Sequence, residues 1–347
     1  MRESGLIGKP MPKLIGLQYL RAIAATLVVL FHAAVNTKLP FGFGTLGVDI
    51  FFILSGFLMW AITDERTRPG SFLRDRVRRV VPVYWVATVV VFAGVSLGMF
   101  RNTKGGVAHL IESLAFIPHF SPTNGKLYPL LLPGWTLNYE MFFYALFALT
   151  LFLSRRWQPV LISLFFLGLV AIGHITKPTD ALGRFYTDAI ILEFAMGMWL
   201  GILWKNGWRS PIGVPALLLV ATLGFVAPYF AGTASLRILR FGVPALVIVT
   251  AVLLIETERP LPRWRFLELL GDASYSIYLW HSLFIAATLK CLFFLGAPQI
   301  LAFATAAVVG LAGGLAAYWL IEKPILQVFK ASSRNRRMAK AVASSSA

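Results

Sequence analysis

The sequence predicts an all-α polytopic membrane protein with about ten transmembrane helices and both termini in the cytoplasm. Hydrophobic residues make up 58% of the 347 residues and charged residues only 14%, whereas about a quarter of the residues in a soluble domain are charged. The mean hydropathy is +0.74. A water-facing fold of this length cannot bury so much apolar surface, so lipid is the expected solvent.

Ten apolar runs are long enough, or nearly long enough, to cross the hydrocarbon core as helices. They are residues 14–35, 46–62, 80–99, 134–153, 159–175, 185–204, 212–231, 238–255, 273–293 and 298–321. The first run carries charge and is longer than the apolar part of a signal peptide, so it is expected to remain as a span. We therefore predict one transmembrane domain over residues 1–330 and a disordered cytoplasmic tail over residues 331–347.

The basic residues are distributed as expected for a membrane protein. With the N-terminus placed in the cytoplasm, 23 of the 32 Lys and Arg residues fall in or beside cytoplasmic segments. This asymmetry is typical of multi-pass proteins of the cell (inner) membrane and explains the net charge of +17 without a nucleic-acid partner. The single Cys291 excludes a disulfide framework. No His, Cys or acidic spacing indicates a metal ligand set, so we predict no metal and no permanently bound cofactor.

The first run contains Arg21 and His32, which are eleven residues apart. Eleven residues of α-helix turn through about 1100°, so both side chains lie on one face, with ~16 Å between them along the axis. Charged groups within a span are candidates for function. Imidazole has a pKa near the operating pH, so His32 is our candidate general base near the outer surface. The alternative is an arginine that snorkels to the inner headgroups and a histidine at the outer ones.

Two of the carboxylates within predicted spans are candidates for function. Asp49 is a candidate to orient His32, as the acid of a catalytic triad orients its imidazole, or else to pair with an arginine or cap its helix. Glu140 follows the long outer loop and shares a helix face with Thr136 and Tyr144. Its carboxylate is a candidate to hold a sugar hydroxyl or to pair with His32.

His281 is the remaining candidate within a span, and Ser274 and Tyr278 lie on its helix face. It is equally consistent with a histidine that lines a donor channel and with a structural histidine. Ser55 and Gly56 are interpreted as small residues that let two helices approach closely.

Six segments in series resemble the acyltransferase-3 family, and the resemblance covers essentially the whole chain. The first is LQYLRAIAATLVVLFHA, which contains the Arg-x10-His pattern of that family. The others are GVDIFFILSGF (47–57), FLRDRVRRVVPVYW (72–85), WTLNYEMFFY (135–144), SYSIYLWH (274–281) and IEKP (321–324). The chain departs from the usual pattern at Thr136 and Met141, which leaves Glu140 as the only acidic residue of its motif. Within the family, the sequence is most similar to ExoZ-type exopolysaccharide O-acetyltransferases.

The resemblance implies an enzyme that takes an acetyl group from cytoplasmic acetyl-CoA, its co-substrate. The acceptor is a hydroxyl of a polysaccharide or lipid-linked oligosaccharide at the outer side, and an association with a polysaccharide assembly complex is implied as well. The Arg-x-x-Arg of the family falls on Arg76 and Arg79, and guanidinium groups suit the phosphates of coenzyme A. Arg21 then lines the donor path, and His32 takes the hydroxyl proton or carries the acyl group. The competing hypothesis is a transporter or flippase for a lipid-linked glycan.

Overall fold

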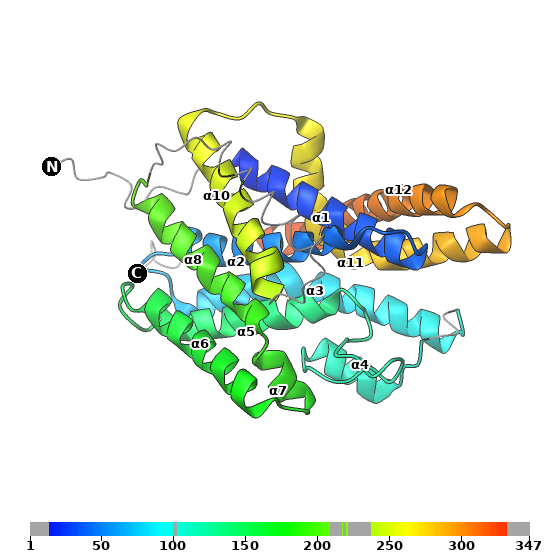
Figure 1. The fold of residues 1–347 in the computed structure, drawn as a ribbon, viewed down its shortest axis with the longest axis horizontal. Coiled ribbons are helices and arrows are strands. Elements are labelled where there is room, and N and C mark those ends of the chain that lie inside the picture. Colours follow the sequence, from blue (N-terminus) through cyan, green and yellow to red (C-terminus); the bar gives the residue numbers. More distant parts are fainter. Residues whose placement is uncertain (1–13, 100–102, 209–216, 218–219, 221–236, 332–347) are drawn as a thin grey trace, which may run out of the picture.

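The computed structural model describes residues 14–99, 103–208, 217, 220 and 237–331, and its regular elements are all helical. Figure 1 shows long helices that run roughly along one axis. In chain order the α-helices are α1 (Ile15–Asn36), α2 (Leu46–Ile62), α3 (Pro69–Ser96), α4 (Val107–Leu114), α5 (Gly134–Thr150), α6 (Gln158–Thr176), α7 (Ala181–Tyr186), α8 (Leu192–Lys205), α10 (Val243–Glu258), α11 (Arg265–Phe294) and α12 (Gln299–Ala317). Short 3-10 or π segments are η1 (Gly42–Thr45), η2 (Ala189–Ile191), η3 (Ile238–Gly242) and η4 (Tyr318–Glu322).

Eight helical stretches among the described residues are long and apolar enough to cross a membrane, which confirms the polytopic fold class. The helix α5 occupies the fourth predicted span but has only 17 residues. The predicted span 212–231 and the predicted tail lie outside the described residues, apart from Leu217, Val220 and Ala331. The second predicted span, 46–62, coincides with α2.

The third span begins earlier than we predicted, because α3 starts at Pro69 rather than near residue 80. Hydropathy excludes the arginine-rich stretch from an apolar run, although arginine is a good helix former. Arg76 and Arg79 therefore lie on a helix that continues into the membrane, not in a loop. Pro69 at the first helical position favours this early start.

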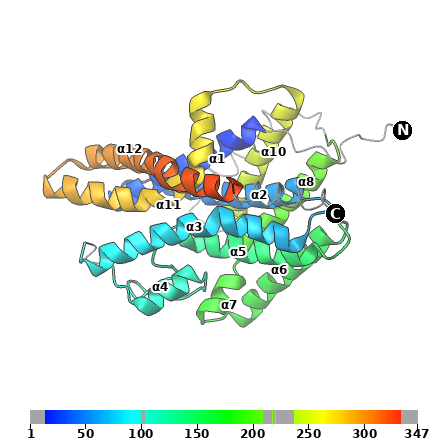
Figure 2. The same ribbon diagram turned by 180° about the vertical axis from the view of Figure 1, so that it is seen from behind.

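Two helix pairs form the frame of the molecule. The helices α11 and α12 form a hairpin against which α1 packs, and α2 packs along α8. Both views of the fold show α1 beside α11 (Figures 1 and 2). A Cβ atom on Gly56 of α2 would overlap the carbonyl oxygen of Phe194, and a Cβ on Gly197 of α8 would overlap that of Ile53. This reciprocal contact confirms that Gly56 allows close helix approach.

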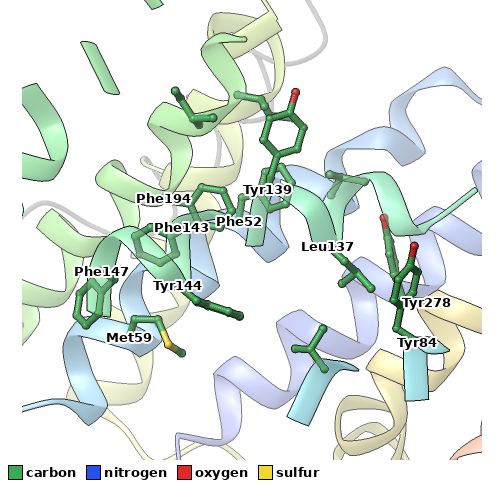
Figure 3. Close-up of a cluster of buried hydrophobic side chains, with 14 of the residues drawn as sticks. Phe52, Met59, Tyr84, Leu137, Tyr139, Phe143, Tyr144, Phe147, Phe194 and Tyr278 are labelled. Atoms are coloured by element: carbon green, nitrogen blue, oxygen red, sulfur yellow. The ribbon is translucent and has the colours of Figure 1, made fainter. Parts of the chain in front are cut away.

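Aromatic side chains fill the space between α2, α5 and α8. Phe194 lies between Phe52 and Phe143, with ring centroids 4.7 and 4.6 Å away, respectively. Figure 3 shows this cluster, with Tyr144 and Met59 beside it. These rings are almost completely buried and fix the faces of α2 and α5 that border the candidate site.

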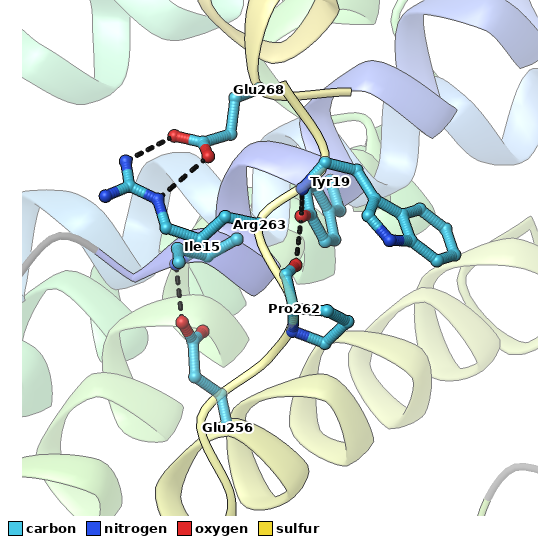
Figure 4. A network of polar contacts seen from close by, with 7 residues as sticks. Ile15, Tyr19, Glu256, Pro262, Arg263 and Glu268 are labelled. Atoms are coloured by element: carbon cyan, nitrogen blue, oxygen red, sulfur yellow. Dashed lines mark hydrogen bonds and ion pairs between the residues drawn. The ribbon is translucent and has the colours of Figure 1, made fainter. Parts of the chain in front are cut away.

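Polar contacts join helix ends that are far apart in the sequence. The carboxylate of Glu256, at the end of α10, accepts hydrogen bonds from the backbone N–H groups of Ile15 and Gly16, which begin α1 (Figure 4). The Tyr19 hydroxyl donates to the carbonyl of Pro262 and accepts from the backbone N–H of Trp264. The ends of α10 and α11 therefore hold the start of α1, the helix with Arg21 and His32.

The segment before α5 places the start of that helix in the interior of the protein. The short helix α4 is held against α3, because the Tyr84 hydroxyl donates to the Ser113 carbonyl at 3.0 Å. The first residue of α5, Gly134, lies directly beside the Tyr84 ring, where a Cβ would be 2.7 Å from the ring. Since Tyr84 is deep within α3, α5 begins well inside the protein and not at its outer surface.

Candidate active site

A cavity of about 150 Å³ lies between α1, α2, α3, α5 and α11. Four charged side chains from three helices line it: Arg21, Arg76, Arg79 and Glu140. Its other walls are hydroxyl groups and apolar side chains, including Ser55, Thr136, Tyr144, Ser274, Tyr275, Tyr278, Phe51, Phe52, Leu54, Leu58 and Met59. The cavity thus brings together four of the seven residues that the sequence predicts for the site.

The two arginines of α3 differ in their surroundings. Arg79 forms an ion pair with Glu322, with Nη1 2.9 Å from Oε1. Glu322 is completely buried and its other oxygen accepts a hydrogen bond from Ser276 at 2.6 Å. Arg76 makes no hydrogen bond or ion pair with any described residue, and its Nε atom is buried without a partner. Arg79 is therefore fixed by protein, whereas Arg76 has its donors available for an anion.

Arg21 also lines the cavity without a hydrogen bond or ion pair to any described residue. Three guanidinium groups and the carboxylates of Glu140, Glu322 and Asp272 lie in this region, and among the described residues neither Arg21 nor Arg76 has a carboxylate in direct contact. A desolvated site of this kind suits an anionic ligand such as a phosphate.

Glu140 lies elsewhere than we predicted. Its carboxylate accepts a hydrogen bond from the Tyr144 hydroxyl at 3.3 Å, and that hydroxyl lies 3.1 Å from the Ser55 oxygen. It faces the cavity with the arginines and does not pair with His32. The reason is that α5 begins beside Tyr84, in the middle of α3, which places Glu140 beside the arginines of α3.

His32 meets His281 and not an acidic residue. Nε2 of His281 lies 3.2 Å from Nδ1 of His32, and the two ring centroids are 4.8 Å apart. His281 is completely buried and is not part of the cavity lining, in contrast to the predicted role in a donor channel. Nε2 of His32 makes no hydrogen bond to a described residue and is not among the buried unpartnered atoms, so it retains accessible surface.

One turn of α11 separates the cavity from the two histidines. Ser274, Tyr278 and His281 follow one face of α11, as the spacing predicts. The Tyr278 hydroxyl lies in the cavity wall, 2.8 Å from the Thr136 hydroxyl. The ring of Tyr278 is 6.1 Å from that of His281. The cavity therefore ends at Tyr278, whose ring separates it from the histidine pair.

Asp49 is held by an arginine, which is one of the alternatives that the sequence left open. Nη2 of Arg237 donates to both carboxylate oxygens of Asp49, at 3.0 and 2.9 Å. Asp49 is fully buried, as is Glu193 of α8 beside it. The position of Asp49 next to His32 in a triad is therefore not observed, because His281 occupies the hydrogen-bonding position on Nδ1.

Sequence reasoning missed three residues that shape the site. Glu322 lies in the quoted IEKP segment, directly after the predicted apolar run 298–321, where an acidic residue at the edge of a span was a usable signal. Ser276 carries no sequence signal beyond its place in SYSIYLWH. Arg237 was assigned to an outer loop, and its partner Asp49 is 188 residues away, so only the fold brings the two together.

Comparison with known proteins places the chain in a family. The acyltransferase-domain family matches residues 14–321. The exopolysaccharide production protein ExoZ of Rhizobium meliloti (strain 1021) is 41% identical over 302 residues, which cover 86% of this chain and 95% of that protein. The putative membrane-bound transacylase BcsY of Komagataeibacter xylinus is 27% identical over 76% of this chain and 70% of its own length.

A more distant relative is longer than this chain. The O-acetyltransferase OatA of Staphylococcus aureus (strain NCTC 8325 / PS 47) is 24% identical over 305 residues, which are 77% of this chain and 49% of that protein. No solved structure matches the chain. The family match over nearly all described helices and the similarity to ExoZ show that this chain belongs to the acyltransferase-3 family and is a membrane O-acyltransferase.

Proposed function

We propose that this enzyme moves an acetyl group from acetyl-CoA on the cytoplasmic side to a hydroxyl of an exopolysaccharide or lipid-linked glycan on the outer side. The proposal is carried by one arrangement: the arginine-lined cavity and the accessible Nε2 of His32 lie along the same helix, α1. The similarity to ExoZ, whose name refers to exopolysaccharide production, supports the choice of acceptor class.

The donor binds with its phosphates at the arginines of the cavity. Arg76 and Arg21 have free donors, so they make the direct contacts, while Arg79 contributes charge from its position against Glu322. The acyl end of the donor then points along Ser274 and Tyr278 towards His32.

The transfer step needs a base at the attacking hydroxyl. Nε2 of His32 takes the proton as the hydroxyl oxygen bonds to the thioester carbonyl carbon. The carbon–sulfur bond then breaks, and the proton passes from His32 to the thiolate, which leaves as coenzyme A. The products are the acetyl ester and the free thiol, so atoms and charge balance.

The first experiment is His32→Ala in the producing strain, with expression checked and His174→Ala as the control. His174 is exposed at the end of α6, so its replacement leaves the site intact. We expect normal export of a glycan whose O-acetyl groups are missing by NMR. Loss of export with acetylation intact would instead support the transporter hypothesis.

A second experiment tests the phosphate contact at Arg76. We expect Arg76→Ala to weaken binding of coenzyme A by roughly 10- to 100-fold, the usual effect of losing a hydrogen bond to a charged group. Binding of acetyl-pantetheine, which has no nucleotide, stays unchanged. Arg74→Ala is the matched control, because Arg74 is on the same helix but exposed and outside the cavity. Equal losses for both ligands would rule out a phosphate contact.

A further inference from the structure

The contacts of the two histidines determine where their hydrogens lie. Nδ1 of His281 is 3.1 Å from the carbonyl oxygen of Ile277, and Nδ1 of His32 is 3.0 Å from that of Val28. A carbonyl oxygen only accepts, so each Nδ1 carries a hydrogen. A neutral imidazole has one N–H, which leaves Nε2 of each ring as an acceptor.

The hydrogen on Nδ1 of His32 therefore has two acceptors. One is the Val28 carbonyl in its own helix, and the other is Nε2 of His281, 3.2 Å away on α11. This arrangement leaves the lone pair of Nε2 on His32 pointing away from both, on the atom that retains accessible surface. His281 has no accessible surface, so it contacts neither the acetyl donor nor the acceptor glycan.

We propose that His281 is a positioning residue: together with the Val28 carbonyl it accepts the Nδ1 hydrogen of His32, and it orients the ring so that Nε2 of His32 serves as the base. This inference rests on the proposed role of His32 in acyl transfer. When Nε2 takes the hydroxyl proton, His32 becomes an imidazolium and its bond to His281 becomes charge-assisted and stronger. The neutral His281 thus performs the orienting task for which the sequence suggested Asp49.

The edge of the ring of Phe31 packs against His32, with 5.1 Å between the centroids. Phe31 and His281 therefore restrict the rotation of His32. A hydrophobic replacement of His281 would preserve packing but remove the acceptor, so packing and hydrogen bonding are separable by substitution.

Two amide variants provide the sharpest test, since they differ by one methylene. In His281→Gln, Oε1 is as many bonds from Cα as Nε2 of histidine and can accept the Nδ1 hydrogen. In His281→Asn, the amide reaches only as far as Nδ1. We expect kcat within a few-fold of wild type for Gln and a loss of roughly 10- to 100-fold for Asn and for His281→Leu. KM for acetyl-CoA and the affinity for coenzyme A stay unchanged in all three.

Other outcomes overturn the proposal. An equal loss of kcat in His281→Gln and His281→Asn, or full activity in His281→Leu, would show that His281 has only a structural role. A raised KM for acetyl-CoA with unchanged kcat would indicate that His281 lines the donor channel. Activity in His32→Ala would instead refute the proposed function, so the two failures are distinguishable.

A measurement on wild-type protein covers the case in which variants fail to fold. The chain has five histidines, so ¹⁵N-histidine labelling gives few signals, and His32→Ala identifies that of His32. Where His32 is neutral, we expect its hydrogen on Nδ1. A hydrogen on Nε2 would overturn the proposal.

Discussion

The contact between α2 and α8 leaves no room for a methyl group, which makes Gly56→Ala a demanding test of the fold. The new Cβ would lie 2.0 Å from the Phe194 carbonyl oxygen, whereas Cβ atoms in proteins essentially never come within 3.0 Å of another heavy atom. Backbone cannot rotate away as a side chain can, so the helices would have to separate by about 1.4 Å to reach ordinary contact at 3.4 Å. Overpacking of this kind costs about 1–3 kcal/mol.

We expect the melting temperature of purified Gly56→Ala to fall by about 2–12 °C, since 1 kcal/mol corresponds to about 2–4 °C in a protein of this size. Coenzyme A binding should also weaken, because the neighbouring Ser55 lines the cavity. Gly197→Ala makes the reciprocal clash with Ile53 and should have a similar effect. Because both changes separate the same helices, the double variant should lose less than the sum.

Gly168→Ala in α6 is the matched control, because nothing lies within 4 Å of its added Cβ. There the same substitution should raise stability by about 1 kcal/mol through helix propensity. A Gly56→Ala protein that melts within a degree of wild type and binds coenzyme A normally would refute the close crossing of α2 and α8.

Three further predictions concern charge, pH and topology. Glu322→Gln leaves the partly exposed Arg79 without its buried counter-ion and should lower stability by about 1–3 kcal/mol in a denaturation assay. Burial, and then the neighbouring His119, lower the pKa of His109 in the short helix α4 below 6.5. The unfolded chain therefore takes up this proton first as pH falls below 6.5, so melting temperature should fall with pH more in wild type than in His109→Gln. Cys291 is exposed near the end of α11, and a membrane-impermeant maleimide should label it from outside intact cells.

Each of these has a control that can contradict it. Glu258 is exposed, so Glu258→Gln should leave the stability unchanged. An equal loss of stability in Glu258→Gln and Glu322→Gln would show that the ion pair between Arg79 and Glu322 does not stabilise the fold. An identical pH profile in wild type and His109→Gln would show that this buried ring does not titrate between the folded and unfolded states. Labelling of Cys291 only after lysis would reverse the proposed orientation.

The sequence predicted best where an apolar run is bounded by turn-forming or charged residues. The bounds of α2 coincide with the prediction because Gly42–Thr45 precede it and Thr63 and Asp64 follow it. The prediction from apolar runs failed at the start of α3, because helix propensity extends this helix beyond its apolar part. Helix phase correctly placed Ser274, Tyr278 and His281 on one face of α11.

Depth and long-range pairing were not predictable from periodicity. The depth of Glu140 depends on the contact of Gly134 with Tyr84, which lies 50 residues earlier in the chain. The two histidines are 249 residues apart, and each helix pattern shows only which face is polar, not which face of another helix it meets. Contacts of this kind follow from the packing of whole helices.

The position of Arg21 bears on the two interpretations of this residue. A snorkelling arginine extends its guanidinium group to the lipid headgroups and needs no protein site. Arg21 instead lines an internal cavity together with Arg76 and Arg79, where like charges repel unless something offsets them. Glu140, Glu322 and Asp272 offset this charge, but among the described residues neither Arg21 nor Arg76 has a carboxylate in direct contact. Charged groups within a membrane segment are candidates for function, and this position is the reason for the donor-binding role that we propose for Arg21.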